Sequence, residues 1–285
     1  MRTGKIGFVI PDITDDFYFR IVRGVEQNLK PHHYSLIVSS TSADGEYEAA
    51  AIKMLLENGV DGLILMTFRL ESRELKEIPW NGLPLVFIGG QMPNLPADTV
   101  EVAQEDGAYL AARHLIELGH KDVGIILGSL DSYDSELRLR GYGRALQDSG
   151  LPFNPNWAVR GEFTREGGCK AAYEMLSRYP RPSAILACND WMALGTMNAA
   201  GELGITVPQD LSIVGFDDIA PARRSYTPLT TVRQPALEVG QMAARAVLNR
   251  IRSPLRPFSH IVLETELMIR KTTAPFWAAP LENTR

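Results

Sequence analysis

The chain has 285 residues, a formal net charge of -5, a hydrophobic fraction of 45% and a charged fraction of 22%. This length suggests about two domains of ordinary globular composition. The excess of acidic residues argues against a basic face that grips nucleic acid. The sequence shows neither a signal peptide nor an apolar run long enough to span a membrane, so we expect a cytoplasmic protein that does not contact a membrane.

Strand-type apolar runs alternate with helix-type segments through the first hundred residues. Continuous apolar runs predict strands over 5–11, 34–40, 60–66, 83–88 and 99–102. Apolar residues at helical spacing predict helices over 17–29 and 46–57. Short β-α-β connections of this kind predict a parallel sheet with right-handed crossovers.

The same alternation continues after residue 104. Further strands are expected over 123–127, 184–187, 211–216 and 259–269, and helices over 106–118, 137–147, 169–176, 192–203 and 237–252. We therefore predict an α/β fold with two doubly wound parallel-sheet subdomains facing each other across a cleft.

Two polar pairs follow strand-type runs, and they mark the most informative stretch of the chain. Asn189-Asp190 comes after AILAC, and Asp217-Asp218 comes after LSIVGF. The carboxyl ends of parallel strands meet at one edge of a sheet, where open α/β sheets bind ligands. We expect this stretch to form one wall of a small-molecule pocket, and one of Asn189 and Asp190 to cap the following helix.

Other candidates for ligand contact lie near predicted strand ends. Asp12 lies in the polar loop after the first strand, and Phe17 and Tyr18 follow it at the start of a helix. An aromatic ring there either stacks on a ligand or packs at the helix start. Arg138, near the start of another predicted helix, carries a rigid guanidinium fork that suits hydroxyls or a carboxylate.

The sequence gives little support for an enzyme. The neighbouring carboxylates of Asp217 and Asp218 lack a water-activating partner, and no nucleophile elbow, P-loop or dinucleotide fingerprint occurs. Two cysteines and five histidines are present without metal-ligand spacing, so we expect neither a metal nor a cofactor.

Six segments, in order, resemble the lactose/galactose repressor family of bacterial transcription regulators. They are KIGFVIPDITDDFYFRIVRGVE, EDGAYLAARHLIELGHKDVGIILG, RLRGYGRAL, NDWMALGTMNAAGELGITVPQDLSIVGFDD, LTTVRQP and IRKTT. The resemblance covers the effector-binding region along nearly the whole chain.

The resemblance implies a periplasmic-binding-protein-like fold with three crossovers and a homodimer. The N-terminal subdomain would comprise 5–103, completed by 234–262, and the C-terminal subdomain 104–233, completed by 263–278. Operator DNA would be read only by the family's N-terminal helix-turn-helix headpiece, which this sequence lacks. A small-molecule effector, most simply a sugar, would bind in the cleft and control operator binding allosterically.

The family pattern also assigns the ligand-binding positions. They are Asp12, Phe17, Tyr18, Arg138, Phe163, Asn189, Asp217 and Gln234. Gly89-Gly90-Gln91 departs from the family, since many relatives carry an Asp there, and this leaves a different sugar or a non-sugar effector open. Two alternatives remain: a solute-binding protein of a sugar transporter, with the same fold and cleft, and an enzyme on a doubly wound fold.

Overall fold

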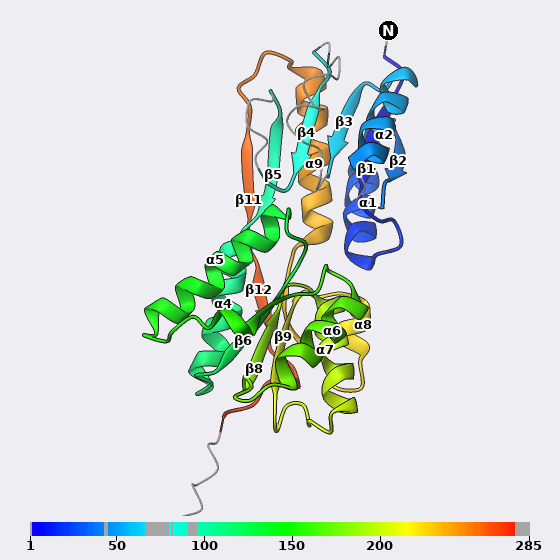
Figure 1. Cartoon of the computed structure of the whole chain (residues 1–285). Coiled ribbons are helices and arrows are strands. Elements are labelled where there is room, and N and C mark those ends of the chain that lie inside the picture. The colour runs from blue at the N-terminus through cyan, green and yellow to red at the C-terminus, as the bar shows by residue number, and fades with distance from the viewer. Residues whose placement is uncertain (1, 43–44, 67–79, 81, 91–95, 277–285) are drawn as a thin grey trace, which may run out of the picture. The chain divides into compact units, whose positions relative to one another are not determined.

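The computed structural model describes residues 2–42, 45–66, 80, 82–90 and 96–276. The chain forms two compact units. Unit 1 comprises Met1–Ala103, Asp131–Asp134 and Gln234–Thr265, and unit 2 comprises Gln104–Leu130, Ser135–Arg233 and Glu266–Arg285. Each unit contains one sheet with helices on its faces (Figure 1), which is the predicted α/β class.

The sheet of unit 1 has the strand order β11-β5-β4-β3-β1-β2, and its neighbouring strands are all parallel. The strands are β1 (Lys5–Ile10), β2 (Ser35–Ser40), β3 (Gly62–Leu65), β4 (Leu85–Ile88), β5 (Asp98–Val102) and β11 (His260–Leu263). The inner strands β3 and β4 are buried at every residue, as parallel strands covered on both faces should be.

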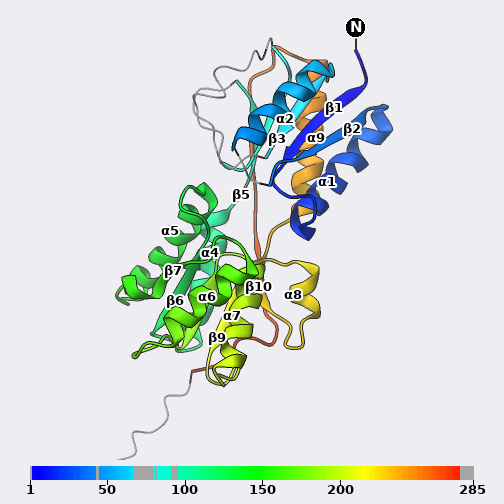
Figure 2. The same ribbon diagram turned by 45° about the vertical axis from the view of Figure 1, so that its right-hand side comes forward.

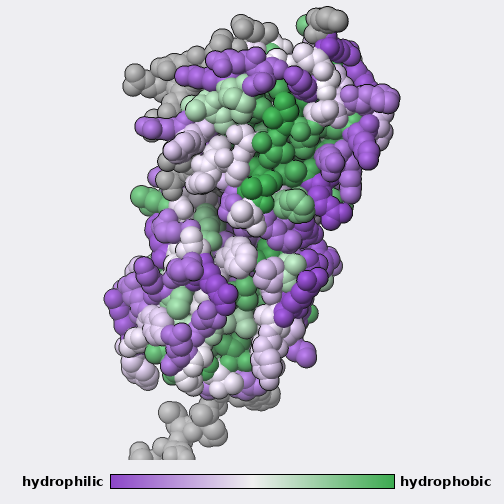
Figure 3. Space-filling view, turned by 90° about the vertical axis from the view of Figure 1, so that its right-hand side faces the viewer, coloured by the Kyte–Doolittle hydropathy of each residue, from purple (hydrophilic) through white to green (hydrophobic). Residues whose placement is uncertain are grey.

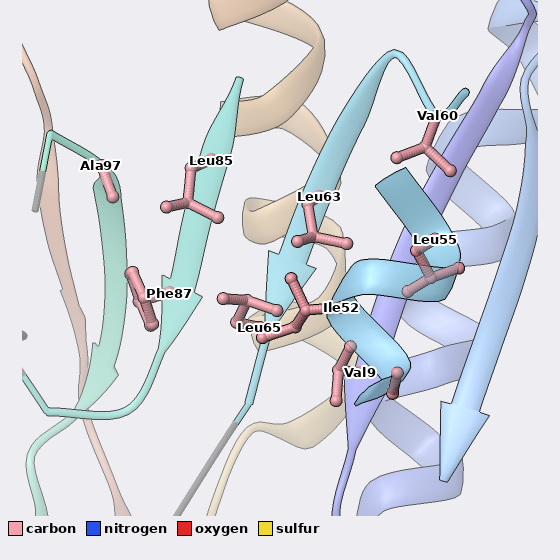
Figure 4. Packing of buried hydrophobic residues seen from close by; sticks show 10 residues of the cluster. Val9, Ile52, Leu55, Val60, Leu63, Leu65, Leu85, Phe87 and Ala97 are labelled. Carbon is pink, nitrogen blue, oxygen red and sulfur yellow. The ribbon is translucent and has the colours of Figure 1, made fainter. Parts of the chain in front are cut away.

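Helices cover both faces of this sheet (Figure 2). α2 (Gly45–Glu57) lies on one face, and α1 (Asp16–Leu29) packs against α9 (Ala236–Arg252) on the other. Asp15 caps α1 by accepting a hydrogen bond from the backbone N–H of Phe17 at 2.8 Å. Figure 4 shows the core on the α2 face, where Ile52 and Leu55 meet alternate residues of the strands, such as Leu63 and Leu65.

The sheet of unit 2 has the order β12-β10-β9-β8-β6-β7. Its strands are β6 (Val123–Leu127), β7 (Ala158–Arg160), β8 (Ala184–Ala187), β9 (Ser212–Asp217), β10 (Thr230–Arg233) and β12 (Glu266–Met268). All neighbours are parallel except β12, which pairs antiparallel with β10. The predicted single strand over 259–269 is therefore wrong. β11 pairs with β5 in unit 1, β12 pairs with β10 in unit 2, and the residues between them join neither sheet.

Unit 2 also carries helices on both faces of its sheet. α4 (Gln104–Glu117) and α5 (Tyr133–Asp148) lie on one face, while α6 (Arg165–Leu176) packs on α7 (Asp190–Glu202) on the other; the short α8 (Ala220–Arg224) follows β9. Two one-turn 3-10 helices, Lys30–His32 and Pro155–Trp157, complete the described elements. Across the described ranges, we find no helix with the length and apolarity that a membrane span needs.

Candidate functional site at the carboxyl edge of unit 2

Four of the predicted ligand-binding residues belong to unit 2 and lie around the carboxyl ends of its strands. Asp217 ends β9, and Asn189 follows β8 by two residues. Arg138 reaches the same edge from α5, where it donates a hydrogen bond to the carbonyl oxygen of Cys188. Phe163 accepts a hydrogen bond at its backbone oxygen from the Asn189 amide at 2.9 Å. All four residues therefore belong to the segments at the carboxyl edge of one sheet, and the Asn189 amide binds the Phe163 backbone directly.

Arg138 is fixed in place by three neighbours. Its side chain is buried, its Nε donates to Gln104 Oε1 at 2.9 Å, and its guanidinium carbon lies 4.0 Å above the centre of the Phe216 ring. A guanidinium held by hydrogen bonds and by an aromatic face is oriented before any ligand arrives. Gln104 and Phe216 were not predicted from the sequence. Gln104 begins α4 and Phe216 lies within an apolar strand, so neither stands out by residue type or spacing.

The Asp217-Asp218 pair forms a turn with unusual backbone angles. Asp217 has φ of +111° and Asp218 has φ of +56°. Residues other than glycine rarely adopt positive φ, and such conformations persist only where the surroundings enforce them. The Asp217 side chain is buried with a small exposed remainder, at 7% of the residue's surface. The chain therefore leaves the sheet directly after Asp217, which is the last residue of β9 in register with β10.

Asp218 takes a structural role that separates it from Asp217. Its carboxylate is fully buried and bonds Arg233 Nε at 2.8 Å and Arg270 Nη2, with Arg223 Nε at 3.9 Å. Arg233 ends β10, and Arg270 follows β12. A buried carboxylate needs this kind of compensation. The ion cluster therefore joins the turn after β9 to the end of β10 and to the segment that follows β12.

Asn189 and Asp190 divide their roles in a similar way. Asn189 is the N-cap of α7, since its Oδ1 accepts from the backbone N–H of Met192 at 2.8 Å. This confirms the expectation that one member of the pair caps the helix. Asp190 is fully buried, and burial together with the nearby charge of Asp217 raises its pKa well above the usual range.

Phe163 lies over a glycine that leaves room for its ring. A Cβ atom at Gly128, the residue after β6, would lie 2.0 Å from the tip of the Phe163 ring. Glu162 and Phe163 both have positive φ, at +52° and +58°. The half-buried ring is therefore held by a strained backbone on one side and the bare backbone of Gly128 on the other.

The other predicted residues belong to unit 1. Asp12 is exposed, and its Oδ1 accepts from the backbone N–H of Thr14 at 2.8 Å. Phe17 is buried in the core of unit 1, and its ring contacts the half-buried Tyr18 edge to face at a centroid distance of 5.3 Å. Gln234 is buried directly after the end of β10. Of the Gly89-Gly90-Gln91 segment, Gln91 lies outside the described residues.

The chemistry available at this edge is binding through hydrogen bonds and charge. Cys188 is buried, and burial raises the pKa of its thiol to about 12, although the nearby Arg138 charge acts in the opposite direction. This high pKa keeps Cys188 from acting as a thiolate. The described part of the chain contains no group of three or more His, Cys, Asp or Glu side chains placed to hold a metal ion.

Comparisons with known proteins agree with this geometry. The model of the periplasmic binding protein-like domain matches residues 112–273. The chain is 35% identical to a ribose operon repressor of Haemophilus influenzae over 95% of this chain and 81% of the relative. It is 34% identical to the HTH-type transcriptional repressor PurR of Haemophilus influenzae, with the same coverage. A LacI family transcriptional regulator from Enterococcus faecium, solved with bound ribose, superposes with a TM-score of 0.87 at 28% identity, over 96% of this chain and 100% of that one.

Proposed function

The chain belongs to the LacI family of transcriptional regulators, and we propose that it is the effector-sensing region of a repressor that responds to a sugar. The single observation that carries this proposal is the presence of two buried charged side chains, Arg138 and Asp217, at the carboxyl edge of unit 2. A carboxylate that accepts from hydroxyls and a fixed guanidinium that donates to ring or hydroxyl oxygens together suit a polyhydroxylated ligand. Relatives described as a ribose operon repressor and as a ribose complex support the sugar class.

We assign the effector contacts to residues of both units. In unit 2 these are Arg138, Asn189, Asp217 and the ring of Phe163. From unit 1 we assign Asp12, Tyr18 and Gln234, and Phe17 supports Tyr18 from the core because its own ring is buried. Asn189 has already used its oxygen on α7 and one amide hydrogen on Phe163, so its second amide hydrogen is the group we assign to the effector.

Effector binding controls DNA binding only through a difference in affinity between two conformations. By linkage, the factor by which the sugar changes affinity for operator DNA equals the factor by which DNA changes affinity for the sugar. DNA contact falls to the helix-turn-helix headpiece of the family, and not to these residues, whose net charge is -5. A repressor of this kind acts in the cytoplasm.

We further propose that the chain forms a homodimer through unit 1. Its edge strand β2 carries three half-buried apolar residues, Leu36, Ile37 and Val38. Figure 3 shows a hydrophobic area on the face of unit 1 that carries α1, α2 and β2. An apolar edge strand is an aggregation hazard unless something covers it, and a second copy of the chain would do so.

Light scattering after size exclusion tests the dimer. We expect twice the chain mass for the wild type and for Tyr179→Lys, a control at a tyrosine with 95% exposure in unit 2. Val38→Lys should shift the mass towards one chain at low concentration. A wild-type monomer at every concentration would contradict the homodimer and favour the solute-binding alternative.

The sugar proposal is tested by calorimetric titration of the purified chain with D-ribose, followed by other pentoses, hexoses, disaccharides and nucleobases. Saturable binding of a sugar that is recovered unchanged is the expected result. Binding of a nucleobase with no response to any sugar would overturn the sugar class, and turnover of the sugar would show an enzyme instead.

A further inference from the structure

Asp190 lies beneath the Asp217-Asp218 turn and bonds to two different segments. Its carboxylate has no exposed surface, and its Oδ2 accepts from the backbone N–H of Ile219 at 2.8 Å. Its Oδ1 accepts from the hydroxyl of Thr231, on β10, at 2.6 Å. One side chain at the first residue of α7 therefore joins the turn after β9 to the neighbouring strand β10.

The hydrogen bond to Ile219 acts where the backbone needs it. Asp217 and Asp218 both have positive φ, and Ile219 is the residue at which the chain returns to ordinary angles before α8. A strained turn relaxes unless its neighbours hold it. Asp190 holds the end of this turn, while the arginines around Asp218 hold its middle.

The neighbouring strand is shaped to admit this carboxylate. A Cβ atom at Gly215 would lie 2.3 Å from Asp190 Oδ1, so any side chain at that position would displace the carboxylate. Gly215 lies two residues before Asp217 on β9. The absence of a side chain at Gly215 is what allows Asp190 to sit under the turn.

We propose that Asp190 is a positioning residue that sets the carboxylate of Asp217 for the effector and ties it to β10, without touching the effector itself. This inference rests on the proposed function, in which Asp217 contacts the sugar. β10 leads directly into Gln234, where the chain passes from unit 2 to unit 1. Asp190 thus links the residue that meets the effector to a strand that leaves the unit.

The surroundings of Asp190 disfavour its charged form. Burial and the nearby Asp217 charge both raise the pKa of Asp190. An asparagine is the matching neutral replacement, since its oxygen can accept from Ile219 and its amide can donate to the Thr231 hydroxyl. Asp190→Asn should therefore preserve the arrangement that Asp190→Ala destroys.

Hydrogen exchange without any ligand tests the positioning directly. In Asp190→Ala, amides of the peptide covering 216–222 should exchange about tenfold faster, the effect of losing one buried hydrogen bond. Asp190→Asn should stay within about twofold of the wild type, and other peptides of unit 2 should keep their protection. Should Asp190→Ala fail to fold, Asp190→Ser offers the same comparison, because its hydroxyl is too short to bond both partners.

Thr272→Val is the matched control. The Thr272 hydroxyl is fully buried and also makes two hydrogen bonds near the opposite end of β9: it accepts from the Thr230 N–H at 2.8 Å and donates to Ile213 O at 2.7 Å. Thr272→Val should have a lower melting temperature than the wild type. Any change in the hydrogen-exchange rate of 216–222 should be no larger than the change in the other peptides of unit 2. Unchanged exchange of 216–222 in Asp190→Ala, or a loss of protection spread evenly over unit 2, would overturn the proposal.

A second readout uses D-ribose, or the sugar bound best by the wild type. Asp190→Ala should bind it about tenfold more weakly, while Asp190→Asn binds within about threefold of the wild type. Wild-type affinity in Asp190→Ala would overturn the positioning role. If the wild type binds no sugar, the proposed function fails, and hydrogen exchange still decides whether Asp190 holds the turn.

Discussion

Replacing Arg138 with lysine removes the planar guanidinium but keeps the positive charge, so it tests the role of the guanidinium's shape alone. Arg138 makes two buried hydrogen bonds, to Gln104 Oε1 and to the Cys188 carbonyl, and its planar face stacks on Phe216. Lysine keeps the charge but cannot make both bonds while it lies flat on a ring. One buried hydrogen bond to a charged group contributes about 1.5–3 kcal/mol, and the lost stacking adds about 0.5–1 kcal/mol.

We therefore expect Arg138→Lys to lower the free energy of unfolding by about 3 kcal/mol. That loss corresponds to a drop of roughly 5–10 °C in the melting temperature, measured by scanning calorimetry. Arg165→Lys is the control, since Arg165 makes an exposed hydrogen bond to Asn198 at 3.2 Å and its replacement should cost less than about 0.5 kcal/mol. Equal melting temperatures for the two variants would refute the claim that Gln104, Cys188 and Phe216 fix the guanidinium.

Three further predictions concern the other features of the two units. Gly128→Ala should displace the Phe163 ring, since the new methyl would lie 2.0 Å from it, and should cost about 1–3 kcal/mol of stability in urea titrations while weakening sugar binding. Burial lowers the pKa of His120 in the folded chain, so the unfolded state binds a proton more readily. The free energy of unfolding should therefore decrease as the pH falls below about 6.5. Urea titrations at several pH values should show a weaker dependence on pH in His120→Asn than in the wild type. Burial alone would raise the pKa of Asp98, but hydrogen bonds from Arg250 and Ser259 outweigh it and lower the pKa. Asp98→Asn removes the carboxylate that pairs with the buried Arg250 and should cost about 3–5 kcal/mol in the same assay; a cost near zero would contradict this.

Much of the fold follows from the spacing of apolar residues. The continuous runs of β1, β3, β4, β6 and β8 lie in fully or almost fully buried parallel strands, and such runs are easily recognised. β7 and β12 have 3 residues each and lie at sheet edges, so they present too few alternations for a periodic signal. The direction of β12 depends on pairing with β10, which no local pattern encodes.

The sequence predicted where the candidate site residues lie in the fold, but not the contacts that hold them in place. Polar residues after strands indicated the carboxyl edge, and the family pattern selected Arg138 and Asp217 from among many arginines and aspartates. The partners that fix them were not predictable. Gln104 reaches Arg138 from a helix 34 positions away, and the positive φ of Asp217 comes from the packing around the turn. Both depend on tertiary contacts.

We propose that Asp217 binds a sugar effector at the edge of unit 2. This is tested by calorimetric titration of the best sugar ligand into the wild type and into Asp217→Ala, with circular dichroism to confirm that both chains are folded. We predict saturable binding by the wild type and a loss of about tenfold or more in affinity for Asp217→Ala, because a hydrogen bond to a carboxylate contributes about 1.5–3 kcal/mol. Equal affinity of the two folded chains would show that Asp217 does not contact the sugar.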